Sequence, residues 1–166
     1  MDSIHFVREN LQRSESIVLS RIDDMRDHGM TTPTSAGGCH TLWILGHLAY
    51  IEGLVISGFM LGEANPLADW EKMFDGEQVC HDHTRLVSFD RALTECRAMR
   101  ASTVARLDTM TEQDLDRASA NAPGGGTDLL FGNYRRCFQY AADHWLMHRG
   151  QLANARSAAG LGPMWY

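Results

Sequence analysis

The chain has 166 residues, a length typical of one domain, with 44% hydrophobic and 22% charged residues, which excludes a disordered protein. Its formal net charge is −6 and acidic and basic residues are interspersed, so no nucleic acid is expected as a partner. The sequence is charged from Asp2 onward and its four cysteines form no CxxC pair, so we expect a cytoplasmic protein with reduced thiols and no signal peptide.

The first predicted element is an amphipathic helix. Apolar residues recur at spacings of three, four or seven, which is the period of one helical face. Asp2 or Ser3 can cap its start and Gly29 can end it. We therefore expect one helix of about seven turns. The apolar positions are Ile4, Val7, Leu11, Val18, Ile22 and Met25.

The second predicted helix is apolar on most sides. It follows a connector at residues 31–38 and extends from Leu42 to Phe59. The stretch resembles a membrane span in length, but it contains His47, Glu52 and several glycines. We interpret it as the buried core helix of a protein that does not enter a membrane.

A long crossover separates the second and third helices. Residues 62–84 contain glycines and Pro66, and Ser88 then caps a helix that extends from Phe89 to Met110. Thr111 followed by Asp114 suggests a further short turn. A crossover of about 23 residues can span the length of a helix, so helices two and three can point the same way. Its apolar residues are expected to cover the bundle, with a helical turn around residues 68–74; they are Leu67, Trp70, Met73 and Phe74.

A fourth helix follows the glycine-rich loop at residues 121–126. Its apolar period begins at Phe131, continues to Ala159 and ends at Gly160. Four long helices in a single domain over residues 1–166 predict an all-α fold, a four-helix bundle. With the long crossover, the topology we favour is up-down-down-up.

Three histidines are predicted to meet inside this bundle. His144 and His148 are spaced i, i+4, so their imidazoles lie one turn apart on the same apolar face. His47 lies on the apolar face of the second helix. A single inward histidine is usually a hydrogen-bonded core residue, but three buried imidazoles without partners would be costly, and one cation satisfies them all. We therefore predict a divalent metal site at His47, His144 and His148.

Three neutral ligands leave a metal ion with an open coordination position, as in catalytic sites. An ion there can bind water or a thiol and lower its pKa. Tyr50, Tyr140 and Gln151 are candidates to hold the imidazoles through their other ring nitrogens. Histidine ligands suit several metals, so zinc and nickel are the expected ions without a choice between them.

Two other groups of metal-binding residue types compete with this site. Residues 80–83 read Cys-His-Asp-His, but neighbouring residues rarely converge on one ion, and a solvated loop is the simpler interpretation. Cys39 and His40 directly precede the second helix, where they can supply a ligand or cap the helix, and we favour a cap.

The motifs around these histidines resemble those of the DinB-like (DNA-damage-inducible, YfiT-like) superfamily. They are WILGHLA at residues 43–49, HWLMHRGQL at 144–152 and LGPM at 161–164. The resemblance implies an up-down-down-up metal-binding bundle, often homodimeric, with His47, His144 and His148 as the ligands. Characterised members of the family include transferases and isomerases that use a low-molecular-weight thiol such as bacillithiol or mycothiol.

Two functions remain open on this basis, because a fold does not fix a reaction. The first is a metal-dependent enzyme, a thiol S-transferase or thiol-dependent isomerase, that activates a low-molecular-weight thiol or water for attack on a small electrophile. The second is a metal-carrying or stress-related binding protein without turnover, whose fourth ligand would come from the protein. A purely structural bundle with hydrogen-bonded histidines is a third interpretation.

Overall fold

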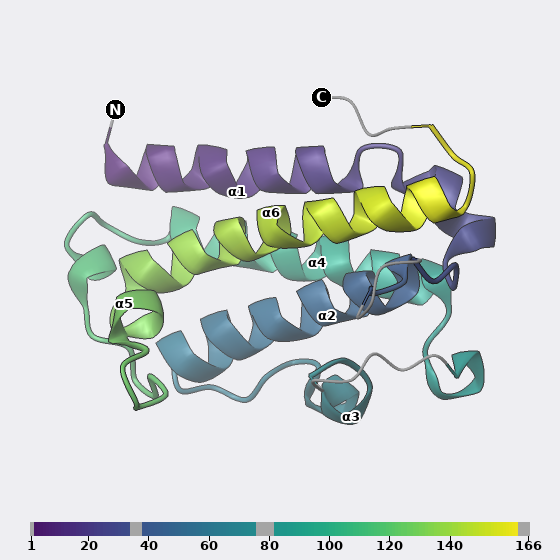
Figure 1. Cartoon of the computed structure of the whole chain (residues 1–166). Coiled ribbons are helices and arrows are strands. Elements are labelled where there is room, and N and C mark those ends of the chain that lie inside the picture. The colour runs from purple at the N-terminus through teal and green to yellow at the C-terminus, as the bar shows by residue number, and fades with distance from the viewer. Residues whose placement is uncertain (1, 34–37, 76–81, 163–166) are drawn as a thin grey trace.

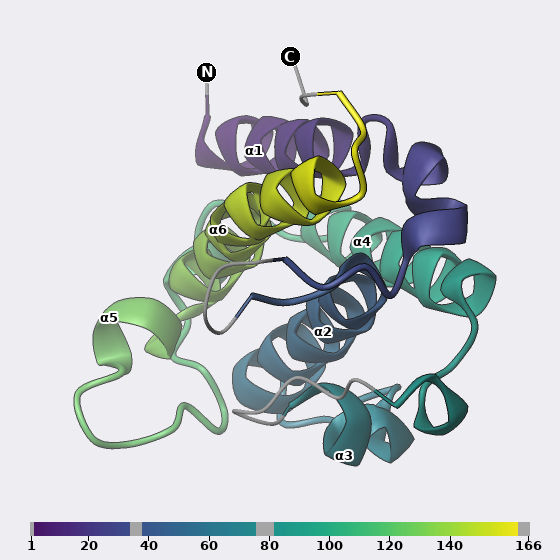
Figure 2. The ribbon, with the colours of Figure 1, turned by 45° about the vertical axis from the view of Figure 1, so that its right-hand side comes forward.

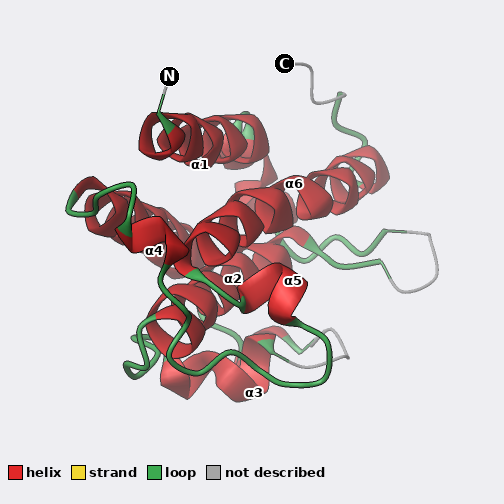
Figure 3. Ribbon diagram, turned by 90° about the vertical axis from the view of Figure 1, so that its left-hand side faces the viewer, coloured by secondary structure: helices red, strands yellow, loops and turns green. Residues whose placement is uncertain are grey.

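The computed structural model describes residues 2–33, 38–75 and 82–162, and within these residues every regular element is a helix. Figure 3 shows helices joined by loops, and the one β-type pairing in the described part of the chain is an isolated bridge between Ala118 and Asn133. The predicted all-α class is confirmed.

Four long helices form the body of the molecule. Helix α1 packs along α6 and α2 packs along α4, and contacts between α1 and α4 and between α2 and α6 join the two pairs (Figure 1). Helix α2 continues directly into a π-helical segment, η2, at Leu54–Met60. The long helices span Ser3–Leu19 (α1), Thr41–Gly53 (α2), Phe89–Asp108 (α4) and Tyr134–Ala158 (α6).

The single first helix that the apolar period predicts is in fact two elements. Helix α1 ends at Leu19, and Arg21 adopts a left-handed conformation with φ +59°. The chain then forms the 3₁₀ helix η1 at Ile22–His28. Ile22 and Met25 are buried in η1 just as they would be in a continued α-helix. The apolar period therefore continues across the break, so the spacing of apolar residues does not reveal where α1 ends.

The crossover carries the helical turn expected around residues 68–74. It consists of the 3₁₀ turn η3 at Ala68–Trp70 followed by the short helix α3 at Glu71–Phe74, which lies against α2 (Figure 2). A further 3₁₀ turn, η4, spans His83–Arg85. Trp70 and Phe74 are fully buried and Leu67 nearly so. The crossover thus adds to the core, as its apolar residues predict.

The remaining short elements lie between α4 and α6. The turn predicted at Thr111 and Asp114 is present, with η5 at Asp114–Asp116. Helix α5 spans Asp128–Phe131 and is separated from α6 by Gly132 and Asn133, whose side chain caps α6. The fourth predicted helix therefore begins three residues late, because Asn133 favours a helix cap.

By length and composition, the helical stretch Thr41–Met60 is able to cross a membrane, but 72% of its apolar window is buried inside the structure. Core helices of soluble proteins have the same properties. Glu52 lies inside this stretch, where its carboxylate is paired with a buried cation. The stretch is therefore a core helix in this structure, which gives no clear sign of a membrane protein.

A buried ion pair joins all four long helices. Arg100 of α4 and Glu52 of α2 are 0% and 2% exposed, and the guanidinium donates to Glu52 Oε2 from Nη2 at 2.9 Å and from Nε at 3.2 Å. The Trp145 indole donates to the same oxygen at 2.7 Å, and its ring lies 4.2 Å from the guanidinium carbon. The guanidinium also donates to the Leu11 carbonyl and the Ser14 hydroxyl of α1 and to the Ala141 carbonyl of α6.

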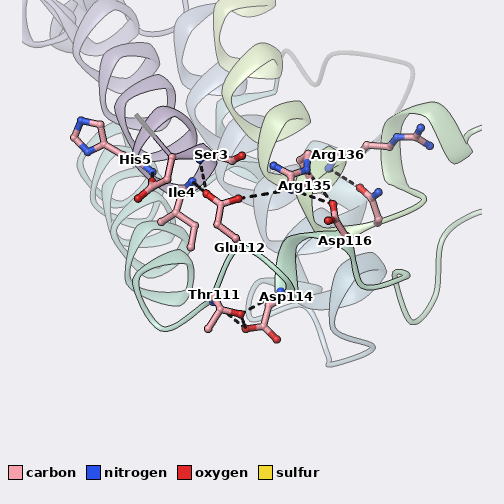
Figure 4. A network of polar contacts seen from close by, with 11 residues as sticks. Ser3, Ile4, His5, Thr111, Glu112, Asp114, Asp116, Arg135 and Arg136 are labelled. Carbon is pink, nitrogen blue, oxygen red and sulfur yellow. Dashed lines mark hydrogen bonds and ion pairs between the residues drawn. The ribbon is translucent and has the colours of Figure 1, made fainter.

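A second polar network joins the start of α1 to the loop after α4 (Figure 4). The backbone N–H groups of Ser3 and Ile4 donate to Glu112, and Arg135 of α6 pairs with Asp116 and, more distantly, with Glu112. These groups are largely exposed to solvent, so each pair contributes little to stability.

Replacing Arg100 with Met should reduce the free energy of unfolding by about 3–5 kcal/mol, because Glu52 would remain buried without its counterion. Arg106→Met is the matched control: Arg106 pairs with Glu63 at the surface, and the loss there should stay below about 1 kcal/mol. Urea unfolding followed by circular dichroism measures both. Equal losses in the two variants would contradict this role of the buried pair.

Candidate metal centre

His47 is held in one orientation by the crossover. It lies on α2, one turn after Trp43, and the two rings stack with centroids 4.4 Å apart. Its Nδ1 lies 2.6 Å from the carbonyl oxygen of Phe74 in α3. A carbonyl only accepts, so Nδ1 carries the proton and Nε2 keeps its lone pair. This is the arrangement that fixes the tautomer of metal-binding histidines.

His144 and His148 project from one face of α6, one turn apart, as their spacing predicts. Their ring centroids are 4.7 Å apart, and their Nε2 atoms approach to 3.1 Å. The Nδ1 of His148 lies 2.5 Å from Gln151 Oε1, so His148 donates from Nδ1 and presents the lone pair of Nε2. Gln151 therefore holds His148 in the way that the sequence suggests.

The structure brings all three predicted histidines together. The His47 ring lies 5.1 Å from that of His144 and 4.9 Å from that of His148, and one ligand atom from each residue falls within 4.8 Å of the others. In His47 and His148 the ring proton is on Nδ1 and points away from the cluster, toward Phe74 and Gln151. The lone pair on Nε2 of each ring therefore points toward the centre of the cluster. Lone pairs this close repel one another unless a proton or a cation lies between them. The cluster can therefore hold a metal ion.

Burial keeps these imidazoles uncharged. Desolvation lowers the pKa of His47, although the bond to Phe74 opposes the shift. Desolvation, with repulsion from His148 and His47, lowers the pKa of His144 to about 2. Desolvation and His47 lower the pKa of His148 to about 4, against the effect of Gln151. At neutral pH all three are in the form that binds metals.

The third imidazole, that of His144, is held mainly by stacking. Tyr140 lies one turn before it, and the two rings are 5.4 Å apart and nearly parallel, at 13°. Tyr140, proposed from the sequence as a partner, therefore packs against a candidate ligand. For Tyr50, the other tyrosine considered, the described partner of the hydroxyl is Asp75; burial and that carboxylate raise the pKa of Tyr50 to about 12.

The sequence patterns did not predict that Phe74 and Gly46 help to position His47. The carbonyl of Phe74 carries no side-chain signal, and the crossover places it 27 residues from His47. Gly46 lies under the Phe74 ring: a Cβ there would come within 2.2–2.5 Å of three ring atoms. Gly46, directly before His47, could have indicated this contact, because a glycine inside a helix can mark a place where another part of the chain packs closely against it.

Of the competing groups, Cys39 and His40 are not part of this cluster. His40 caps α2, with its Nδ1 accepting from the backbone N–H of Trp43 at 3.1 Å, as favoured from the sequence. Cys39 is buried, and burial raises the pKa of its thiol. In the group at residues 80–83, Cys80 and His81 lie outside the described residues.

Gly46→Ala should lower the free energy of unfolding by about 1–3 kcal/mol, because the new methyl group overlaps the Phe74 ring in a packed core. Gly150→Ala is the control: Gly150 is also inside a helix, but a Cβ there meets nothing within 4 Å. That change should be neutral or stabilising by up to about 1 kcal/mol. Thermal unfolding of both variants tests the packing, and an unaltered Gly46→Ala protein would contradict it.

The metal-free protein should lose stability as the pH falls below about 6.5, the ordinary pKa of an imidazole. The sign follows from the lowered pKa values: the unfolded chain takes up protons first, and the folded chain does so only toward about 4 at His148 and about 2 at His144. Urea midpoints at pH about 7.5 and about 5 measure this loss.

In the same experiment, His144→Asn should show a smaller loss of stability on acidification, because it removes the group with the largest shift. His5→Asn, at an exposed position of α1, is the control and should keep the loss seen for the unmodified chain. An equal loss in the His144→Asn variant would contradict the burial of a neutral imidazole.

One of three comparisons with known proteins gives a match, to a family model, and that match agrees with this geometry. No match was found among curated proteins or among solved structures. The family model of the DinB superfamily matches residues 10–152, a range that includes all three histidines of the cluster. That superfamily is a metal-binding family. The chain therefore belongs to the DinB superfamily.

Proposed function

We propose that this protein is a metal-dependent enzyme in which His47, His144 and His148 hold one divalent ion, zinc or nickel. The substrate would be a small electrophile, and the nucleophile a low-molecular-weight thiol or water. The observation that carries the proposal is the convergence of three neutral imidazoles, two with their lone pairs fixed inward by Phe74 and Gln151. Among the described residues, no carboxylate or thiolate completes this group.

A bound divalent cation would act as a Lewis acid here and lower the pKa of a thiol or water at its open position. The other residues of the site would orient the histidine ligands and shield them from water. Phe74 and Gln151 fix two tautomers, while Trp43 and Tyr140 stack on His47 and His144 and exclude water from them. In the transfer, the thiol sulfur would bond to the electrophilic carbon, the leaving group would depart with its bonding electrons, and the thiol proton would pass to solvent.

We further propose the up-down-down-up order for the bundle. Its support is the course of the ribbon in Figure 1, where the colours along α1 and α6 progress in one direction and those along α2 and α4 in the other. A cytoplasmic homodimer acting on small molecules, without nucleic acid or membrane partners, is consistent with the net charge of −6 and with the family resemblance. Light scattering of the purified protein measures the number of chains.

The proposed site predicts that His148→Ala loses both metal and turnover. The unmodified protein should bind about one zinc or nickel ion per chain, and the variant close to none, because two imidazoles are a poor site. His5→Ala is the control, since His5 lies exposed on α1. Elemental analysis measures the ion, and absorbance measures the conjugation of bacillithiol, mycothiol or cysteine to 1-chloro-2,4-dinitrobenzene. Full activity in metal-free His148→Ala would exclude the proposal.

The alternative is a metal-carrying protein without turnover. It would close the coordination sphere with a fourth protein ligand, from this chain or from a second copy. X-ray absorption of the metal-loaded protein separates the two, since a fourth ligand that does not exchange with added thiol would favour the carrier.

A further inference from the structure

A mostly apolar pocket lies beside the histidine cluster, between α5 and α6. Its volume is about 490 Å³, within the range of small-molecule sites. Leu129 and Leu130 of α5 and Met147 of α6 form its apolar wall, and they are 77%, 47% and 59% exposed. Exposed apolar side chains that gather in one place often mark a surface for a ligand or a partner. We call this space the α5–α6 pocket.

The pocket adjoins the candidate metal centre. Tyr140 lines the pocket and stacks on His144, so one ring separates the two spaces. Asp143 and Met147 also line the pocket, and each directly precedes one of the two histidines of α6. Successive residues of an α-helix are rotated by about 100°, so the pocket and the cluster occupy adjacent arcs of the same two turns.

The charges in the pocket nearly cancel. Arg136 and Asp143 are its ionised side chains, and they carry opposite signs. Asp143 accepts from Gln139 at 2.9 Å, and the Arg136 guanidinium donates to the carbonyl of Asp128 at 2.6 Å. Each charged side chain therefore has a neutral hydrogen-bond partner, the two charges offset each other, and most of the remaining wall is apolar. Such a pocket suits an uncharged apolar molecule better than an anion or a cation.

We propose that the α5–α6 pocket binds the apolar body of the electrophilic substrate and that the substrate is an uncharged aryl or alkyl electrophile. This inference rests on the function proposed above. The Tyr140 ring would form the end of the pocket nearest the cluster, so that the electrophilic carbon of a bound molecule lies toward the imidazoles. Specificity would then depend on α5, which contributes no residue to the histidine cluster.

A second apolar groove serves as an internal comparison. It lies between α1 and α6, has a volume of about 450 Å³, and includes Phe6 and Arg135. Among the described residues that line it, none stacks on or hydrogen-bonds to the three imidazoles. Arg135 is also engaged by Asp116 in the network of Figure 4. This groove shares Arg136 and Gln139 with the α5–α6 pocket but does not reach the three imidazoles.

Photolabelling tests the pocket without requiring turnover. The probe is 3-phenyl-3-(trifluoromethyl)diazirine, an uncharged aryl compound that loses N₂ on irradiation and leaves a carbene that inserts into nearby C–H bonds. Peptide mass spectrometry should place the label on Leu129, Leu130 or Met147, which line the α5–α6 pocket and not the α1–α6 groove, in both metal-free and metal-loaded protein. Excess chlorodinitrobenzene should reduce this label. Labelling confined to residues 2–7 and Arg135, on the side of the α1–α6 groove away from the pocket, or spread evenly over the surface, would overturn the assignment.

A matched pair of variants adds a kinetic test. Leu130→Glu places a charge in the pocket, whereas Leu146→Glu places one at a similarly exposed position, 42% against 47%, that does not line it. Leu130→Glu should raise KM for chlorodinitrobenzene by about tenfold or more, the effect of losing about 1.4 kcal/mol of binding, with metal content unchanged. Leu146→Glu should leave KM unchanged.

The outcomes separate this inference from the function on which it rests. If the protein transfers no thiol but the label maps to the α5–α6 pocket and falls with Leu130→Glu, the enzymatic proposal fails and the binding site remains. If the protein conjugates thiols while Leu130→Glu matches Leu146→Glu in KM and in labelling, the pocket assignment fails alone.

Discussion

The arrangement of this molecule depends on the buried pair of Arg100 and Glu52. Removing two charges from water costs several kcal/mol per ion, and the cost is met only when nearly every polar atom finds a partner. Here the partners of the guanidinium come from α1, α2 and α6, while Arg100 itself lies on α4. All four long helices must therefore adopt one relative position to satisfy a single side chain.

The same pair fixes the relation between the two helices of the candidate metal centre. Glu52 lies five residues after His47 on α2, and its Oε2 accepts from the indole of Trp145, which directly follows His144 on α6. A shift of α6 by one residue along α2 would break this bond and also separate the imidazoles. Among the described residues, Glu52 Oε1 is a buried side-chain oxygen without a hydrogen-bond partner, so the carboxylate is held mainly through one oxygen.

Sequence patterns predicted the long helices well, because each has an apolar face and most have a capping residue. Asp2, Ser88 and Asn133 each accept from the backbone N–H three residues later. The break after Leu19 was not predictable in this way, since Arg21 is an ordinary residue in a left-handed conformation and the buried positions keep their period across it. Backbone geometry of this kind leaves no mark on apolar spacing.

The candidate site was predictable in its side chains and not in its backbone contacts. The i, i+4 spacing and the inward position of His47 predict that the three histidines meet, and the contact of Gln151 follows from its place three residues after His148. The Phe74 carbonyl is the opposite case. Every residue has a carbonyl, so no sequence pattern distinguishes the one that accepts from His47. The α5–α6 pocket was also not predictable from the sequence, because it depends on the position of the four-residue helix α5 against α6.

The contact between Phe74 and His47 makes the crossover a thermodynamic partner of the candidate metal centre. Linkage is reciprocal: if a ligand at His47 is held more firmly when the crossover is in place, then occupancy of the site stabilises the crossover by the same free energy. The region around α3 would therefore exchange its amide hydrogens more slowly in the loaded protein, although α3 itself supplies no ligand side chain to the cluster. The amide exchange of the crossover, which the sequence presents as a connector, would therefore indicate whether the site holds a metal ion.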